Sequence, residues 1–287
     1  MKYSIKPLSQ EMEKFGYRYG IGMAETLSAL LDYIIGFMNP DGKPVEGWRY
    51  NKEQNQCFYT MMSVYFNIMQ DALVHDGWHD AFGDLFMEWA GSKNALGQCF
   101  TPACICDMMA DCTFGDTKPD VPQVNCNGFG RRITVSDCAC GSGRLLLAAA
   151  SKLERIGAEK PYLIGEDIDA MCCKQTAINM MIHGCYGEVI CHDTLCEPGE
   201  ARFGYIVNEG LYPFPALPTI RRFTDSNVFV GCRIWKAREQ AKESPRIEEA
   251  VIVEPVKAEP RKAQLLAPHP QQSTPTVRNQ SVSEKSR

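Results

Sequence analysis

The sequence predicts an α/β fold, and three segments carry this prediction. Residues 133–150 begin as a β-branched run, turn through Gly141-Ser142-Gly143 and continue as an Ala- and Leu-rich stretch, in the order strand, glycine turn, helix. Residues 161–169 and 188–191 are predicted to be two further strands, with a helical stretch between them. Strands that alternate with helices in this way indicate βαβ units.

The first 90 residues are predicted to form a helical layer. Ile21–Met38 places apolar residues three and four positions apart and ends at the turn cluster Asn39–Gly42. A second helical region, from about Lys52 to Ala90, carries aromatic and methionine side chains at a spacing typical of a packed core. We therefore expect residues 1–90 to pack on the α/β domain that follows.

Composition limits the classes of function. The chain has 287 residues, 45% of them hydrophobic, which is enough to bury a substantial core. A formal net charge of -5 argues against a protein that coats nucleic acid by itself, so any basic surface must be local or belong to a partner. The amino terminus lacks the apolar core of a signal peptide, and no apolar run is long enough for a bilayer, so we expect a cytoplasmic chain without a membrane partner.

The fourteen cysteines do not follow the spacing of a metal site. The close pairs Cys104/Cys106, Cys138/Cys140 and Cys172/Cys173 are not the C-x-x-C repeats of structural zinc. A cytoplasmic chain keeps its thiols reduced. We expect most of these cysteines to be small buried hydrophobic residues, and we expect no structural metal.

The glycine turn is the most informative stretch. Glycine allows close backbone approach, the new helix presents unpaired N–H groups, and Asp137 can accept from a cationic or hydroxyl-bearing ligand. The string Asp137–Gly143, D-C-A-C-G-S-G, resembles the S-adenosylmethionine loop of adenine-N6 DNA methyltransferases, particularly the modification subunits of type I restriction systems. The usual form there is D-P-A-C-G-S-G, so Cys138 replaces a proline. The resemblance implies that S-adenosyl-L-methionine is bound by Asp137, Ala139, Gly141, Ser142 and Gly143.

A second motif precedes the turn. A hydroxyl cap and a proline in the first turn of a helix explain Thr101 and Pro102 but not Phe100 before them. The string Gly97–Pro102 resembles the G-Q-x-F/Y-T-P motif of the same family. The resemblance implies that Phe100, Thr101 and Pro102 line the methionine end of the cofactor.

Acidic residues follow the next two strands. The spacing from Gly143 to Asp167 suits a carboxylate that accepts from two ribose hydroxyls. Residues 165–169 resemble the family string G-Q-E-I-D, which aligns Asp167 with the ribose acid and leaves Glu166 as an additional acid. Residues 192–195 resemble G-D-T-L, with His192 in place of glycine. By this resemblance Asp193 binds the adenine amine of the cofactor, and Ile168 is an apolar wall for the ring.

The fourth predicted strand departs from the family pattern. Phe203–Asn208 resembles F-D-x-I-V-x-N-P-P-F, the stretch that carries methyl transfer, which implies that Asn208 accepts hydrogens from the target adenine. Both prolines and the following aromatic residue are missing. In one interpretation Glu209 supplies the replacement carbonyl and Tyr212 or Phe214 stacks on the base; the residues predicted to be catalytic are then Asn208 and Tyr212. In the other, the chain binds cofactor or a partner without transferring a methyl group.

The remaining segments complete the predicted organisation. A polar loop, 113–132, ends in an arginine pair that is more typical of a solvated surface than of a phosphate contact. Residues 228–235 are predicted to be one more strand. From Ala237 the composition changes to Glu, Lys, Pro, Gln and Ser, which predicts a disordered tail with at most a short helix at 237–242. The predicted domains are 1–90, 91–236 and 237–287.

The resemblance implies an S-adenosylmethionine-dependent methyltransferase with a Rossmann-like fold and a helical amino-terminal layer. The expected function is adenine-specific (N6) DNA methylation with a degenerate catalytic loop. The alternatives are a non-catalytic cofactor-binding scaffold of a DNA-acting complex and methyl transfer to another acceptor. No segment is large enough to read a DNA sequence alone, so we expect a separate specificity subunit as partner.

Overall fold

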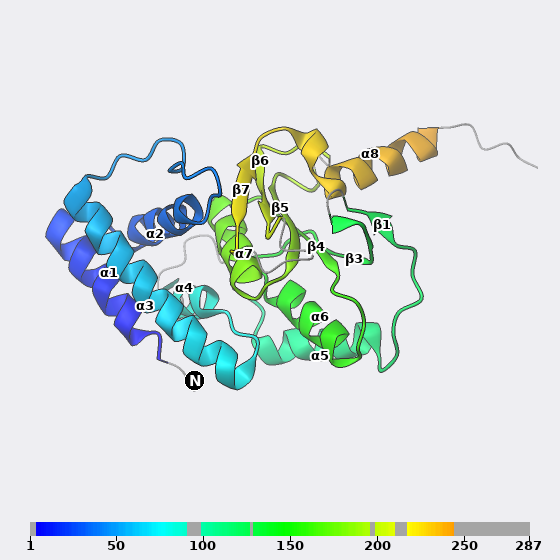
Figure 1. Ribbon diagram of the computed structural model, residues 1–287, viewed down its shortest axis with the longest axis horizontal. Coiled ribbons are helices and arrows are strands. Elements are labelled where there is room, and N and C mark those ends of the chain that lie inside the picture. The colour runs from blue at the N-terminus through cyan, green and yellow to red at the C-terminus, as the bar shows by residue number, and fades with distance from the viewer. Residues whose placement is uncertain (1–3, 91–98, 127–128, 196–198, 210–216, 244–287) are drawn as a thin grey trace, which may run out of the picture. The chain divides into compact units, whose positions relative to one another are not determined.

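The computed structural model describes residues 4–90, 99–126, 129–195, 199–209 and 217–243 (Figure 1). All of them belong to one compact unit, which contacts between residues delimit as Met1–Ser244. The predicted tail beyond residue 243 lies outside the described residues.

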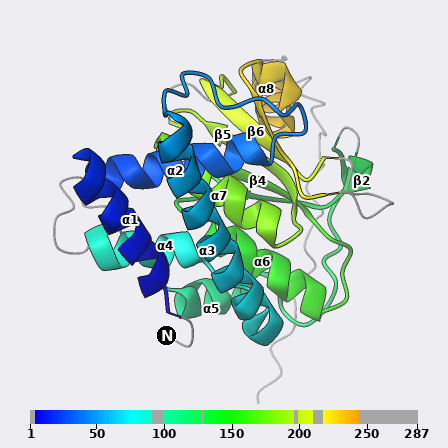
Figure 2. The same cartoon turned by 60° about the vertical axis from the view of Figure 1, so that its left-hand side comes forward.

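The amino-terminal layer is helical, as predicted. It consists of α1 (Lys6–Tyr19), α2 (Met23–Phe37), α3 (Lys52–Asp76) and α4 (Ala81–Ala90) (Figures 1 and 2). The region predicted as 52–90 is two helices, because Gly77 has a left-handed φ of 76° and closes the end of α3 with a bond to the Leu73 carbonyl. Asn51 and Gln54 begin α3 with a reciprocal capping box.

A five-stranded sheet forms the other layer, so the fold is mixed α/β. The strands lie in the order β3 (Thr134–Asp137), β4 (Tyr162–Asp167), β5 (Tyr186–Cys191), β6 (Phe203–Val207) and β7 (Ile220–Phe223). Strands β3, β4 and β5 are parallel, whereas β6 pairs antiparallel with β5, and β7 antiparallel with β6. Helices α6 (Arg144–Arg155) and α7 (Ala170–Ile182) connect the parallel strands, which confirms the predicted βαβ units.

Different helices pack on the two faces of the sheet. On one face, α7 and the helical layer share one hydrophobic core, which includes Leu30 and Phe58 from the layer and Val189 from β5. An ion pair of 2.7 Å between Lys174 on α7 and Asp32 on α2 also joins these layers. The other face carries a separate core around Tyr162, against which α8 (Val230–Glu243) packs.

The predicted strand at 228–235 is wrong. A 3-10 turn at Ser226–Val228 leads directly into α8. The carboxylate of Glu188, buried in β5, accepts from the backbone N–H groups of Val230 and Gly231 at 2.9 and 2.6 Å. The first turn of a helix leaves these N–H groups without a partner inside the helix. Glu188, which is distant in the sequence, therefore caps the start of α8. Helix α8 also runs through the predicted domain boundary at 236–237.

The predicted polar loop at 113–132 contains more structure than expected. After α5 (Ala103–Phe114), β1 (Val124–Asn125) and β2 (Arg131–Arg132) pair as a short antiparallel hairpin. The Arg132 guanidinium donates to the carbonyls of Phe129 and Lys160, both at 2.9 Å, and lies 4.9 Å from the Tyr186 ring. Arg132 therefore stabilises the hairpin against the sheet.

Two further properties of the described residues bear on the sequence predictions. No single described helix is long and apolar enough to cross a membrane, although α1 and α2 pass that test when taken together as a pair bent by 111°. Every described cysteine is a free thiol, and within the described ranges no three His, Cys, Asp or Glu side chains are grouped to hold a metal ion.

Candidate functional site

Three carboxylates meet at one edge of the sheet. Asp137 ends β3, Asp167 ends β4, and Asp193 follows β5 by two positions. The register pairs Asp137 with Gly165 and Asp167 with Cys191. Because the three strands are parallel and adjacent, their carboxyl ends place these side chains along the same edge.

The glycine turn is fixed over the end of β4. The Gly141 N–H donates to Asp167 Oδ2 at 2.9 Å, and the Cys140 N–H donates to the Glu166 carbonyl at 2.9 Å. Gly141 and Gly143 have φ values of 56° and 87°, a left-handed conformation that favours glycine. The turn and the predicted ribose acid therefore form one hydrogen-bonded unit, with Ala139 inside it.

Phe100 lies directly on this turn. Its ring is buried and stacks on Phe86 with centroids 4.9 Å apart. A Cβ atom at Gly141 would lie 3.0 Å from the Phe100 ring. Thr101 and Pro102 follow as exposed residues at the start of α5. The structure thus brings the residues predicted from the two motifs together, although they are about 40 positions apart.

Ser142 does not offer its side chain to a ligand. Its hydroxyl is buried and donates to Asp80 Oδ2 at 2.5 Å. The predicted cofactor contact of Ser142 therefore stays a prediction that concerns its backbone and not its hydroxyl.

Asp80 is a residue that the sequence motifs did not predict. It precedes α4 and accepts from Ser142, from Arg144 Nε at 2.6 Å and from Asn179 Nδ2 at 2.7 Å. It also accepts from the Gly83 N–H at 2.7 Å, which is a local helix-start contact. An acid at a helix start is visible in a sequence, but its three distant partners are not.

The charges at the edge favour a cationic ligand. Burial raises the pKa of Asp137, and the nearby carboxylates of Asp167 and Glu166 raise it further. In the part of the chain that the structure describes, neither Asp137 nor Asp167 forms an ion pair with a basic side chain. A positively charged ligand would relieve this crowding. Ile168, beside these acids, has 60% of its surface exposed and could serve as an apolar wall.

Asn208 lies at the opposite edge of the sheet. Because β6 runs antiparallel, Val207 pairs with Gly187 near the start of β5, and Asn208 follows it there. Its buried amide donates to the carbonyls of Met181 and Cys185 at 3.1 and 2.8 Å and accepts from the Thr219 N–H at 3.2 Å.

This placement is at odds with the predicted catalytic role of Asn208. Its amide hydrogens and its oxygen are already bonded within the fold, and the carboxylates predicted to bind the cofactor lie at the other ends of the strands. The other residue predicted to be catalytic, Tyr212, lies outside the described residues.

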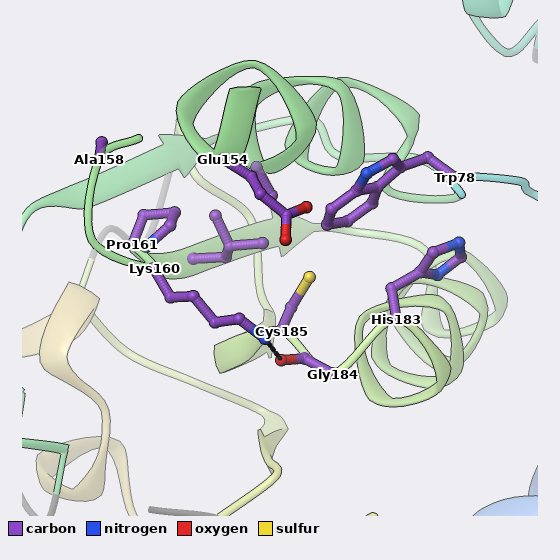
Figure 3. Close-up of a pocket in the computed structure, with 10 residues that line it drawn as sticks. Trp78, Glu154, Ala158, Lys160, Pro161, His183, Gly184 and Cys185 are labelled. Atoms are coloured by element: carbon purple, nitrogen blue, oxygen red, sulfur yellow. Dashed lines mark hydrogen bonds between the residues drawn. The ribbon is translucent and has the colours of Figure 1, made fainter. Parts of the chain in front are cut away.

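A pocket of about 170 Å³ lies at the edge where Asn208 is found (Figure 3). Trp78 stacks on His183 with centroids 5.3 Å apart and ring planes at 5°, and the Glu154 carboxylate lies across the pocket from Lys160. The Lys160 ammonium donates to the Gly184 carbonyl at 3.4 Å. None of the predicted cofactor residues lines this pocket.

Comparison with curated proteins finds no match to this chain. Among solved structures, the type I restriction-modification system methyltransferase subunit from Streptococcus thermophilus is 22% identical, with a TM-score of 0.34. The match covers 52% of this chain and 29% of that one, so the chain spans less than a third of that subunit's length.

A family comparison identifies the segment that contains the site. The model of the N-6 DNA methylase family matches residues 75–215, a span that begins just before Asp80 and includes the glycine turn, all three carboxylates and β6. Over this segment the chain is similar to the N-6 DNA methylase family.

Proposed function

We propose that this chain binds S-adenosyl-L-methionine at the carboxyl edge of β3, β4 and β5 and takes part in adenine-specific methylation of DNA. One observation carries the proposal. Asp137, Asp167 and Asp193 end three adjacent strands around a left-handed glycine turn, and Phe100 lies on that turn. The family match supports DNA as the substrate class.

The residues present fit this cofactor. S-adenosylmethionine carries a positive ammonium and a positive sulfonium, and the crowded carboxylates at the edge are stabilised by positive charge. Asp167 would accept from the ribose hydroxyls, Asp193 from the adenine amine, and Ile168 would cover the ring. A side chain at position 141 would occupy the space next to Phe100, which explains the glycine there. When bound, the cofactor supplies the methyl group.

Titration calorimetry with S-adenosylmethionine tests the cofactor site. We expect micromolar binding to the wild-type chain and a loss of at least tenfold in affinity for Asp167→Asn, which removes the ribose acid. Glu159→Gln is the control, because it removes an exposed loop carboxyl that is not part of this cluster of carboxylates. Equal affinity of Asp167→Asn and wild type would contradict the proposed site.

DNA recognition is proposed to require a separate specificity subunit. The chain carries a net charge of -5, and salt-dependent binding to phosphates needs basic side chains. A methyl-transfer assay with labelled cofactor and unmethylated DNA tests this proposal. Sequence-specific methylation by the purified chain alone would remove the need for the partner.

A second candidate function is cofactor binding without methyl transfer. The position of Asn208 favours it, because the amide that should act on the target base is bonded at the opposite edge. Tight cofactor binding together with absent transfer, on DNA and in the presence of the partner subunit, would support this second function. Transfer that is lost in Asn208→Ala while the variant remains folded would support the first.

A further inference from the structure

A second pocket, of about 240 Å³, lies on the face of the sheet that α8 covers. Strands β3 and β4 form its floor, the segment after β5 one side, and α8 the other. Its lining residues are Thr134, Ser136, Cys138, Ile164, Glu166, His192, Thr194, Gly199, Gly231, Ile234, Trp235 and Arg238. No role in the proposed function uses this pocket.

The pocket and the cofactor carboxylates lie on opposite faces of the same strand ends. Side chains alternate along a strand, so Ser136 and Cys138 face one side, whereas Asp137 faces the other. The same alternation separates Glu166 from Asp167. A ligand in the pocket would therefore be separated from the cofactor site by the thickness of the sheet.

A buried imidazole beside a carboxylate forms the polar centre of the pocket. His192 is 2% exposed, and its Nε2 atom lies 3.3 Å from Glu166 Oε1, on a side chain that is 17% exposed. Hydroxyls of Thr134, Ser136 and Thr194 also line the pocket. The Thr194 hydroxyl donates to the Cys138 carbonyl at 3.3 Å, which joins the segment after β5 to the start of the glycine turn.

Three lining residues are positions where the motifs of this chain differ from the family form. Cys138 stands for proline, Glu166 for glutamine and His192 for glycine. These positions lie on three separate segments of the sequence, yet they line one pocket. These three differences therefore lie together in one pocket, whereas the loss of both prolines after Asn208 does not belong to it.

Helix α8 supplies a fixed outer wall. Its first turn is held by the bonds from Val230 and Gly231 to the Glu188 carboxylate. A Cβ atom at Gly199 would lie 2.8 Å from Trp235 Cδ1, so the indole is packed closely against the backbone there. Arg238, one turn further along α8, is exposed and lines the same pocket.

We propose that this pocket binds a nucleotide whose base carries an exocyclic amine. A carboxylate accepts hydrogen bonds from such an amine, hydroxyls can bond to ring nitrogens, and an indole offers a surface for stacking. The exposed guanidinium of Arg238 suits a phosphate group. The volume is below the roughly 300–1,000 Å³ typical of sites for larger ligands, so it suits one base and not a whole dinucleotide.

Adenosine 5′-monophosphate is the probe that tests this pocket. We expect binding to the wild-type chain that weakens at least tenfold in Glu166→Gln, because a carboxylate acceptor is replaced by an amide. Glu159→Gln is the control, since Glu159 is an exposed carboxyl outside the pocket. Purine riboside 5′-monophosphate, which lacks the amine, should bind at least tenfold more weakly than the probe.

The Asp167→Asn variant separates this pocket from the cofactor site. Binding of adenosine monophosphate that is retained in Asp167→Asn and lost in Glu166→Gln supports the proposal, whether or not S-adenosylmethionine binds. The reverse pattern would place the nucleotide at the cofactor edge and overturn the proposal. No binding to the wild-type chain at millimolar probe would also overturn it.

Competition with a single-stranded oligodeoxyadenylate distinguishes two sources of the ligand. If the oligonucleotide displaces adenosine monophosphate, the pocket binds a base of DNA; if it does not, the pocket binds a free nucleotide. Both results keep the pocket as the binding site, provided that Glu166→Gln weakens the binding. Arg238→Gln should weaken the nucleotide more than it weakens free adenosine, because only the nucleotide carries a phosphate.

Discussion

The hydroxyl of Ser142 donates to the carboxylate of Asp80 at 2.5 Å, across 62 positions of sequence. This bond joins the helical layer to the glycine turn. Arg144, the first residue of α6, adds an ion pair to the same carboxylate at 2.6 Å, and its guanidinium also pairs with Asp84. The amino-terminal helices therefore hold the conformation of the turn that is proposed to bind the cofactor.

Asp80→Asn should lower the free energy of unfolding by about 3–5 kcal/mol, because it breaks a buried ion pair and leaves Arg144 with only the partly exposed Asp84 as an ionic partner. Urea unfolding measures this change. Asp84→Asn is the control: it removes a partner of the same arginine at a site that is 24% exposed, and a smaller loss, about 1 kcal/mol, is expected. Equal losses in the two variants would contradict the central position of Asp80.

Gly141→Ala should weaken S-adenosylmethionine binding at least tenfold. The new methyl group would lie 3.0 Å from the Phe100 ring, and the residue would keep a strained φ near 56°. Gly20→Ala is the matched control, because Gly20 has a similar φ of 67° but no atom lies within 4 Å of the position that its Cβ would take. That variant should lose about 1 kcal/mol of stability and keep its cofactor affinity, as calorimetry can show.

The elements that the sequence predicted correctly depend on local signals. The turn at Gly141 to Gly143 and the acid at Asp167 could be predicted, because glycine conformation and strand ends are encoded by neighbouring residues. The strand predicted at 228–235 is instead a helix, since the Glu188 carboxylate, 42 positions before Val230, caps it. Tertiary contacts override local propensity at such positions.

The difference between local and tertiary signals also explains which parts of the candidate site could be predicted. The two motifs assign Phe100 and the glycine turn to the same cofactor, and in the structure the Phe100 ring lies against Gly141. The direction of β6 could not be predicted, because antiparallel pairing with β5 depends on a connection that local periodicity does not encode. Because of this direction, Asn208 lies at the opposite end of the strands from the proposed cofactor site.

Asn208→Ala should lower the free energy of unfolding by about 2–4 kcal/mol and leave S-adenosylmethionine affinity unchanged. The substitution leaves the buried carbonyls of Met181 and Cys185 without a side-chain donor, and alanine is strained at the φ of 57°. Asn208→Gly loses the same bonds without the strain and should be about 1 kcal/mol more stable than the alanine variant. Chemical unfolding and calorimetry test both variants. An alanine variant as stable as wild type would contradict the structural role.

His183 should make the fold sensitive to acid. Burial lowers its pKa to about 4. Its Nε2 accepts from the His79 N–H at 3.0 Å, and its Nδ1 lies 2.6 Å from the Asn179 carbonyl, so the neutral ring carries its proton on Nδ1. Protonation would place a second N–H against the His79 donor. In the unfolded chain the histidine has its ordinary pKa of 6.5, so it binds a proton at a higher pH than the buried ring does.

The sign of the pH dependence follows from this lowered pKa. The stabilisation is complete above pH 6.5 and is lost as the pH falls toward 4, because the unfolded state binds the proton first. Between about pH 7 and pH 4.5 the free energy of unfolding should fall by about 2 kcal/mol through this residue. In His183→Gln this contribution to the pH dependence of the free energy of unfolding should disappear. His75→Gln is the control: its side chain is 51% exposed, and the variant should keep the pH dependence of wild type. Urea titrations across this range measure the three slopes, and parallel curves for wild type and His183→Gln would show that His183 does not control the transition.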